Sequence, residues 1–248
     1  MSKVVLITGG SRGIGRATAV LAGSRGWTVA VNFTANAEAA ADAVAEIESA
    51  GGRAIAIRAD VSREDDVVAM FESIDRSFGA LDGLVNNAGI VAPALPLAEM
   101  SAERLMRVFA VNIYGAYLCA REAARRMSTG SGGHGGAIVN VSSAAARLGS
   151  PNEYVDYAGS KGAIDTMTIG LSKELAPHGI RVNAVRPGLI DTDIHASGGR
   201  PDRAAVLGAT TPLGRAGAAA EVAEAIVWLL SDAASYVNGA LVDVAGGR

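Results

Sequence analysis

A tyrosine and a lysine four residues apart are the side chains of this sequence best placed for acid–base chemistry. Tyr157 and Lys161 fall in an apolar segment with helical spacing at 154–176, so they share one face of the expected helix. A phenol has a pKa of about 10 and exchanges protons poorly at neutral pH unless a nearby cation, here Lys161, stabilises the phenolate. Such a pair also arises by chance on amphipathic helices, so a purely structural interpretation is the alternative until other residues support the chemistry.

Two serines add that support. Ser142 and Ser143 directly follow a β-branched run at 137–141 that predicts a strand. In doubly wound sheets, ligand-binding groups gather where parallel strands end. We therefore expect a serine hydroxyl, Tyr157 and Lys161 to meet at one edge of a sheet.

A glycine-rich turn indicates a phosphate-bearing ligand. Residues 8–15 have the sequence TGGSRGIG, between the first expected strand and the first expected helix. The small residues Gly9, Gly13 and Gly15 let the backbone approach a phosphate, and a helix N-terminus offers free N–H groups and the positive end of a dipole. The spacing G-x-x-x-G-x-G departs from the G-x-G-x-x-G of the dinucleotide fingerprint. A tight turn that binds no ligand is the alternative.

The same turn also fits a different enzyme class. Residues 9–13 satisfy G-x-S-x-G, which would make Ser11 the nucleophile of a serine hydrolase. That mechanism needs an acid and a histidine later in the chain, and the three histidines are His134, His178 and His195. None of them has a sequence neighbourhood that supports this role, and His195 is the one that remains as a candidate for the catalytic histidine.

Charge near the turn bears on the choice of dinucleotide. The first acidic residue is Glu38, and the basic residues that precede it are Lys3, Arg12, Arg16 and Arg25. An NAD site usually carries Asp or Glu at the end of the second strand, where this chain has Asn32. Asn32 tolerates a 2′-phosphate, and Arg12 could neutralise it. We therefore expect NADP(H) to be favoured over NAD(H), with a solvated Arg12 as the alternative.

Composition narrows the class of protein and its partners. The chain has 248 residues, 50% of them apolar, and its 22 basic and 25 acidic residues give a net charge of −3, which excludes disorder and lacks the basic excess of a nucleic-acid-binding protein. No apolar run reaches the ~20 residues of a membrane span, and no signal peptide is evident. A single cysteine, Cys119, and the lack of a His, Cys and Asp cluster exclude an internal disulfide and a metal site. These features predict a soluble, cytoplasmic protein with a small-molecule substrate.

Alternating strand and helix patterns predict the fold. β-branched runs predict seven strands, at 3–8, 28–33, 54–59, 83–86, 137–142, 181–186 and 240–244. Segments with helical spacing predict helices at 13–24, 37–50, 64–77, 102–127, 154–176 and 219–230. The alternation predicts an α/β Rossmann fold, a doubly wound seven-stranded parallel sheet with helices on both faces. We expect a single domain, 1–248, with an irregular stretch at about 188–212 that is either a substrate loop or an ordinary long connection.

These motifs together resemble the short-chain dehydrogenase/reductase family over essentially the whole chain. The matching motifs are TGGSRGIG at 8–15, Asp60-Val61, NNAG at 86–89, Asn112, Ser143, Tyr157, Lys161, Pro187-Gly188 and Thr192. The sequence looks most like bacterial sugar-dehydrogenase-like and 3-oxoacyl carrier-protein reductase-like oxidoreductases. The resemblance implies reversible hydride transfer between a nicotinamide and a carbonyl or alcohol substrate.

The resemblance also implies the residues of the site. The cofactor would contact Gly9, Ser11, Arg12, Gly13, Ile14, Gly15, Asn32, Asp60, Val61, Asn87, Ala88, Gly89, Tyr157, Lys161, Pro187, Gly188, Ile190 and Thr192. Tyr157 would be the general acid/base, and Lys161 would lower its pKa and hold the nicotinamide ribose. Ser143 would stabilise charge on the substrate oxygen, and Asn112 would hold a water that links Lys161 to solvent.

The serine departs from the family pattern by one residue. The family's serine usually lies thirteen residues before the tyrosine, where this chain has Ala144. We interpret Ser143, fourteen residues before Tyr157, as the catalytic serine and place one extra residue in the loop at 144–156. Ser142 is the alternative.

The sequence constrains the substrate only loosely. Loops at 91–97, 145–155 and 189–212 mix apolar and polar residues, so a 3-oxoacyl compound, a sugar and another small ketone all remain candidates. Apolar residues on more than one face of the helices at 102–127 and 154–176 predict a homo-oligomer, and the resemblance implies a tetramer or a dimer. A dinucleotide-binding regulator without catalysis is the alternative function.

Overall fold

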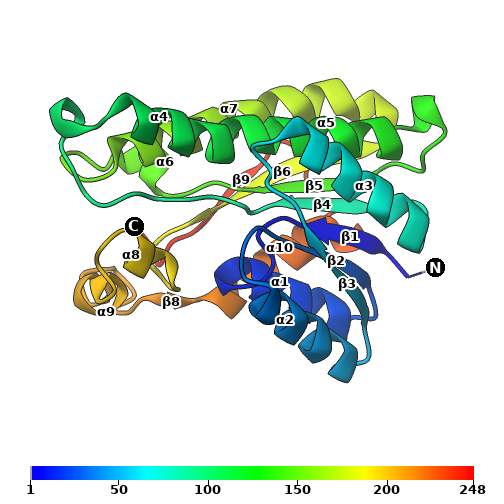
Figure 1. Cartoon of the computed structure of the whole chain (residues 1–248), viewed down its shortest axis with the longest axis horizontal. Coiled ribbons are helices and arrows are strands. Elements are labelled where there is room, and N and C mark those ends of the chain that lie inside the picture. Colours follow the sequence, from blue (N-terminus) through cyan, green and yellow to red (C-terminus); the bar gives the residue numbers. More distant parts are fainter. Residues whose placement is uncertain (1) are drawn as a thin grey trace.

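Seven parallel strands form one sheet in the computed structural model, which describes residues 2–248 apart from the side chain of His195. The strands are β1 (Val4–Ile7), β2 (Thr28–Phe33), β3 (Arg53–Arg58), β4 (Gly83–Asn86), β5 (Gly136–Val141), β6 (Ile180–Pro187) and β9 (Leu241–Val244). Their order is β3-β2-β1-β4-β5-β6-β9, and every pairing is parallel (Figure 1). All seven predicted strands are present, and the predicted α/β Rossmann fold is confirmed.

Long helices cover both faces of the sheet. On one face lie α1 (Gly13–Ser24), α2 (Ala37–Ser49) and α10 (Ala219–Leu230), and on the other lie α3 (Glu64–Phe78), α4 (Ala102–Phe109), α5 (Gly115–Met127) and α7 (Val155–Leu175) (Figure 1). Short 3-10 turns occur at Leu97–Glu99, Thr129–Ser131, Ala176–His178 and Asp232–Ala234. Among residues 2–248, no helix combines the length and the apolar character needed to traverse a lipid bilayer.

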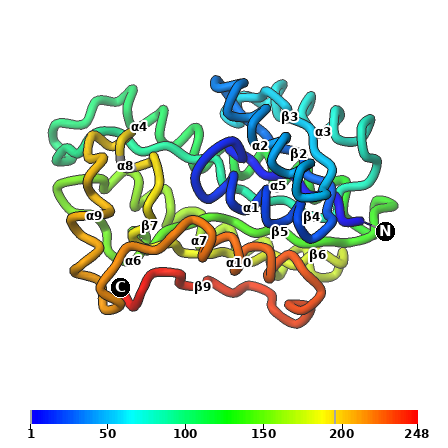
Figure 2. Tube along the Cα trace, turned by 90° about the horizontal axis from the view of Figure 1, so that it is seen from below, coloured from blue at the N-terminus to red at the C-terminus, as the bar shows by residue number. Residues whose placement is uncertain are grey.

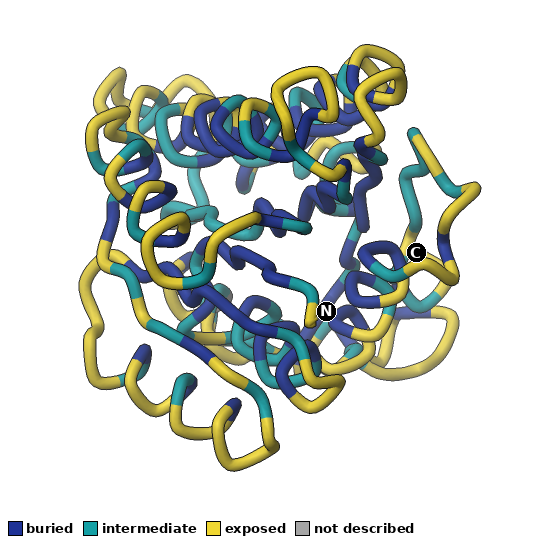
Figure 3. Tube along the Cα trace, turned by 90° about the vertical axis from the view of Figure 1, so that its right-hand side faces the viewer, coloured by how far each residue is buried: buried dark blue, intermediate teal, exposed yellow. Residues whose placement is uncertain are grey.

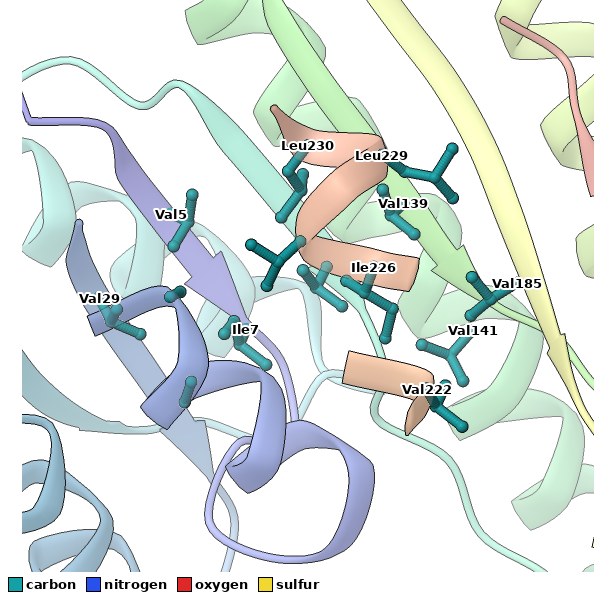
Figure 4. Packing of buried hydrophobic residues seen from close by; sticks show 14 of the residues in the cluster. Val5, Ile7, Val29, Val139, Val141, Val185, Val222, Ile226, Leu229 and Leu230 are labelled. Atoms are coloured by element: carbon teal, nitrogen blue, oxygen red, sulfur yellow. The ribbon is translucent and has the colours of Figure 1, made fainter. Parts of the chain in front are cut away.

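The two faces of the sheet carry separate apolar cores, because successive side chains of a strand point to opposite faces. In β1, Val5 and Ile7 pack on the side of α1 and α10, whereas Val4 and Leu6 pack on the side of α3 and α5. Figure 4 shows the first core, in which Ile226 of α10 lies among the apolar side chains of β1 and β5. Burial is concentrated in the sheet and on the inner faces of the helices (Figure 3). The long apolar runs that predicted the strands are therefore the consequence of two-sided burial.

The predicted helix at 102–127 contains one π-helical turn, Ala110–Tyr114, between α4 and α5. Residues on either side of the turn keep right-handed helical angles, so the helix continues through it. A π turn contains one extra residue, changes the direction of the side chains and is frequent at functional sites. Here Asn112 is buried, and its side chain accepts a hydrogen bond from the Ile90 N–H and donates one to the Ile90 carbonyl.

The stretch at about 188–212 is more regular than predicted. It contains β7 (Ile190–Asp191), α8 (Ile194–Ser197) and α9 (Arg203–Gly208), and β7 pairs with β8 (Gly217–Ala218). Elements this short leave no periodic pattern in the sequence, which is why the prediction of an irregular stretch was wrong. With α6 (Ala145–Leu148), these elements lie at the end of the molecule opposite the N-terminus (Figure 2).

Candidate active site

A cavity of about 930 Å³ opens at the carboxyl ends of the strands. The segments that follow β1 to β6 contribute to its lining, together with the start of α7 and parts of α8 and α9. Strand order reverses between β1 and β4, so the connections on either side leave in opposite directions and open a crevice. This is the edge of the sheet at which the sequence placed the chemical groups.

Most residues that the sequence assigned to the site line this cavity. They are Gly9, Ser11, Arg12, Gly13, Ile14, Asp60, Val61, Asn87, Ala88, Gly89, Ser143, Tyr157, Lys161, Pro187, Gly188, Ile190 and Thr192. Three assigned residues, Gly15, Asn32 and Asn112, lie behind the lining and support it. Thr34 and Arg107 line the cavity although the sequence did not assign them to it. The sequence could have predicted the place of Thr34, because Thr34 directly follows β2. Nothing in the sequence distinguishes Arg107 from the other exposed residues of its helix.

Two glycines shape the turn after β1. Gly13 has a φ of +52°, a left-handed conformation that other residues rarely adopt. A Cβ on Gly15 would lie 2.4 Å from the Gly9 carbonyl oxygen, so α1 can approach the turn this closely only with glycine there. No side chain caps the N-terminus of α1, and its first turn holds no acidic residue. The first-turn amides are therefore free of a side-chain cap and suit an anion, which fits the pyrophosphate of a dinucleotide.

Asn32 holds the glycine-rich turn after β1 in place from the side away from the cavity. Its side chain is buried, with Oδ1 accepting from the Gly9 N–H at 3.1 Å and Nδ2 donating to the Ala59 carbonyl at 3.0 Å. These bonds tie β2 and β3 to the turn and keep the amide away from the cavity. The expectation that Asn32 itself contacts the cofactor is corrected accordingly, and Thr34 is the residue of this segment that lines the cavity.

Tyr157, Lys161 and Ser143 converge on one side of the cavity. Lys161 Nζ lies 5.5 Å from the centre of the Tyr157 ring and donates to the Val141 carbonyl at 2.8 Å, so the end of β5 holds the ammonium. The Ser143 side chain lies close enough to the Tyr157 phenol to affect its pKa. A Cβ placed on Gly89 would lie 3.5 Å from both Asn112 Oδ1 and Lys161 Nζ, so Gly89 lies next to both groups.

The pKa values of both titrating groups are set chiefly by burial. Enclosure by the cavity raises the pKa of Tyr157, and the nearby Ser143 side chain opposes this shift. Burial lowers the pKa of Lys161 to about 8, and the nearby Asp165 carboxylate opposes that shift. The resemblance implied a lowered pKa for Tyr157; in this structure desolvation dominates, so the phenol is protonated at neutral pH.

The two candidate serines have different partners. Ser142 is buried, and its hydroxyl donates to the Lys161 carbonyl at 3.1 Å. Ser143 is the serine whose side chain lies near enough to the Tyr157 phenol to lower its pKa, and its Oγ accepts from the Ala145 N–H. The geometry therefore favours Ser143 for contact with a substrate at Tyr157.

Among the described side chains, the hydrolase alternative finds no histidine that meets Ser11 in the cavity. Ser11 itself lines the cavity. His178 lies beyond the end of α7, beside Gly130, and His134 belongs to the loop before β5. The side chain of His195, the remaining candidate, lies outside the described residues.

Comparison with known sequences gives matches over nearly the whole chain. A family model described as Enoyl-(Acyl carrier protein) reductase matches residues 9–248. The chain is 57% identical over 245 residues to the uncharacterized oxidoreductase YgfF of Escherichia coli (strain K12), with 99% of each chain covered. It is 42% identical to cis-4-hydroxycyclohexanecarboxylate dehydrogenase of Sinomonas cyclohexanicum, covering 99% and 96%. It is 40% identical to L-rhamnose 1-dehydrogenase (NAD(P)(+)) of Sphingomonas sp. (strain SKA58), covering 99% and 95%.

Solved structures agree with these sequence matches. A short-chain type dehydrogenase/reductase from Mycobacterium marinum has a TM-score of 0.92 and 35% identity, with 99% of this chain and 94% of that chain covered. The 3-ketoacyl-(acyl-carrier-protein) reductase from Brucella melitensis, complexed with NADH, has a TM-score of 0.91 and 34% identity, with 99% and 98% covered. Both sequence and fold are thus similar to those of oxidoreductases across their whole length.

Proposed function

The chain belongs to the short-chain dehydrogenase/reductase family and is an NAD(P)-dependent oxidoreductase, and from this premise we propose that Tyr157 is the general acid/base of its reaction. The reaction is the interconversion of a small ketone or aldehyde and its alcohol. One observation carries the proposal: Tyr157, Ser143 and Lys161 converge in the same cavity that the glycine turn enters.

The lining residues divide by position into three groups that would hold the dinucleotide. Those at the turn are Gly9, Ser11, Arg12, Gly13 and Ile14, those after β3 and β4 are Asp60, Val61, Asn87, Ala88 and Gly89, and those after β6 are Pro187, Gly188, Ile190 and Thr192. When bound, the dinucleotide supplies or accepts the hydride. Lys161, with its ammonium held at the end of β5, would bind the ribose next to the nicotinamide.

The proton transfer falls to Tyr157. In reduction, the phenol donates its proton to the substrate oxygen as that oxygen gains negative charge, and in oxidation the phenolate takes the proton back. The raised pKa of Tyr157 keeps the phenol protonated at neutral pH, which is the form that donates the proton in reduction. Ser143 donates a hydrogen bond to the same oxygen and stabilises its charge. Asn112 Oδ1 keeps one acceptor site beside Lys161, where a water would connect the ammonium to solvent.

Arg12 supports a preference for NADP(H). Its side chain is exposed and lines the cavity together with Thr34 and Asn36. Neither Thr34 nor Asn36 is acidic, so a 2′-phosphate bound on this side of the cavity would meet the Arg12 cation without a carboxylate from either residue. One relative is named for NAD(P)(+), and one related structure is complexed with NADH. Both dinucleotides are therefore tested.

Fluorescence titration with NADPH and NADH, at low and moderate salt, tests the preference. We expect tighter NADPH binding in the wild type, weakened by salt, and equal affinities for both dinucleotides in Arg12→Met. Better binding of NADH by the wild type would refute the preference, and binding of neither would refute the dinucleotide site itself.

The outer part of the cavity supports a substrate of modest size and mixed polarity. Val91, Leu148 and Ile194 give it an apolar side, while Ser150 and Asp193 offer hydrogen bonds. Such a lining suits ring alcohols and sugars, the classes named for two of the relatives, as well as other small ketones and 3-oxoacyl compounds. A panel of these compounds, assayed by absorbance of the reduced nicotinamide in both directions, would identify the class.

Exposed apolar side chains on the outer helices support assembly into a homo-oligomer. Met106 of α4, Tyr117 of α5 and Ile169 of α7 are 73%, 44% and 41% exposed, and these helices lie in one layer (Figure 1). Apolar patches of this kind often mark subunit contacts. We expect a tetramer or a dimer by light scattering coupled to gel filtration, and a monomer at micromolar concentration would contradict this.

A further inference from the structure

A buried ion pair lies directly beside Tyr157 and is not part of the proposed chemistry. Arg104 of α4 donates from Nε to Asp156 Oδ2 at 2.8 Å and from Nη2 to Asp156 Oδ1 at 3.2 Å. The two side chains are 10% and 1% exposed. Removing two charges from water carries a large desolvation penalty, so a buried pair is weak evidence for a role in stability alone.

The pair joins three segments that meet at the cavity. Asp156 Oδ1 also accepts from the Tyr157 N–H at 2.9 Å, so the carboxylate holds the first turn of α7. Arg104 Nη1 donates to the Pro93 carbonyl, in the segment after β4. Leu95 of that segment donates its N–H to the Glu153 carbonyl at 3.0 Å, so the segment after β4 is also bonded to the residues just before α7. α4 lies beside α7 in the outer layer, which brings Arg104 to both partners (Figure 1).

The start of α7 lacks a side-chain cap at its N-cap position, so the ion pair of Asp156 with Arg104 is what fixes it to a neighbouring element. Tyr154 occupies the N-cap position, and no side chain caps the helix there. The residues just before it include Ser150 and Asn152 with φ of 45° and 60°, left-handed conformations that are uncommon outside glycine. Ser143 comes from the end of β5, so its distance from the Tyr157 phenol depends on where the first turn of α7 sits.

We propose that Arg104 is a positioning residue which acts through Asp156. It fixes the first turn of α7, and with it the Tyr157 phenol against Ser143, while its bond to the Pro93 carbonyl ties the wall of the substrate space to the same point. This inference rests on the proposed role of Tyr157. Misplacement of a reacting group by about 1 Å can lower a rate about 100-fold, so a support of this kind has a measurable kinetic effect.

Variants of the pair test the proposal. Arg104→Met and Asp156→Asn should each lower kcat about 10- to 100-fold and leave the dissociation constant of the dinucleotide within about twofold, because the turn after β1 is untouched. The double variant should lose little more than either single one, since both remove the same link. Arg104→Lys keeps the charge but cannot bind both carboxylate oxygens and the Pro93 carbonyl in the same fixed geometry. It should therefore recover thermal stability without recovering kcat.

Arg126→Met is the matched control. Arg126 on α5 is 20% exposed and pairs with Asp75 and Glu122, away from the cavity. This variant should lose comparable stability and keep the kcat of the wild type. A purely structural role for Arg104 would give the same kcat in Arg104→Met as in Arg126→Met at equal loss of melting temperature, or full recovery of kcat in Arg104→Lys. Either result would overturn the proposal.

Tyr157→Phe in the same series separates this inference from the proposed function. Loss of turnover in Tyr157→Phe together with normal kcat in Arg104→Met would overturn only the role of Arg104. Normal turnover in Tyr157→Phe would instead remove the general acid/base on which the inference rests.

Discussion

Lys161 should make the folded chain less stable at neutral pH than at alkaline pH, and the effect follows from its burial. Lys161 is 4% exposed, and burial lowers the pKa of its ammonium from 10.5 to about 8. The difference, 10.5 − 8, corresponds to a penalty of about 3 kcal/mol at pH 7, since each pKa unit is worth about 1.4 kcal/mol. Between pH 8 and 10.5 the unfolded chain binds more protons than the folded chain, so stability rises with pH in that window. By pH 10 the penalty falls to about 1 kcal/mol.

Substitution of Lys161 by methionine isolates this effect. The variant has no charge to desolvate, but it leaves the Val141 carbonyl without its donor, at a cost of about 1–3 kcal/mol that does not depend on pH. At pH 7 the two changes largely offset each other. From pH 7 to pH 10 the wild type should gain about 2 kcal/mol relative to Lys161→Met.

Urea unfolding of both proteins at pH 7, 8, 9 and 10 measures the difference between their free energies of unfolding. The contributions of the other titrating groups are the same in both proteins and cancel in this difference. Lys173 is exposed on the same helix, so Lys173→Met is the matched control and should show a constant difference from the wild type. A constant difference for Lys161→Met over this range would refute the reasoning, because it would mean that folding does not desolvate the ammonium.

Three further perturbations test separate parts of the site. Gly15→Ala places a methyl group 2.4 Å from the Gly9 carbonyl and should weaken dinucleotide binding about tenfold or more, measured by titration; unchanged affinity would refute the close approach of α1. Ser143→Ala should lower kcat about 100-fold, whereas Ser142→Ala should act mainly on stability; the reverse order in steady-state assays would reassign the catalytic serine. Because the pKa of Tyr157 is raised, alcohol oxidation should accelerate from pH 7 to pH 10 while carbonyl reduction does not, and parallel pH profiles of initial rates would contradict this.

The sequence predicted the sheet well because of the way its strands are buried. β2 is buried at all six residues and is apolar apart from Thr28 and Asn32, and the helices between strands are long enough to repeat their pattern several times. The short elements after β6 have too few residues for any pattern, so they were expected to be irregular. The π turn at Asn112 is defined by its backbone hydrogen bonds, which residue types do not reveal.

Parts of the site escaped prediction because they depend on contacts between distant segments. Asn32 stands where a cofactor ligand was expected, but the hydrogen bonds of its side chain to the Gly9 N–H and the Ala59 carbonyl are decided by the packing of β3 against β2. Arg104 and Asp156 are 52 residues apart, and neither has an unusual neighbourhood in the sequence. Motif spacing located the groups proposed to react, whereas the residues that hold them became visible only in three dimensions.

Turnover by Tyr157→Phe, measured beside its affinity for the reduced dinucleotide, tests the central claim most directly. The substitution removes only the phenolic hydroxyl, so the cavity and the turn after β1 keep their shape. The account predicts that kcat falls by about 100-fold or more while the dissociation constant of the dinucleotide stays within about twofold. Turnover equal to that of the wild type would contradict the assignment of Tyr157 as the general acid/base.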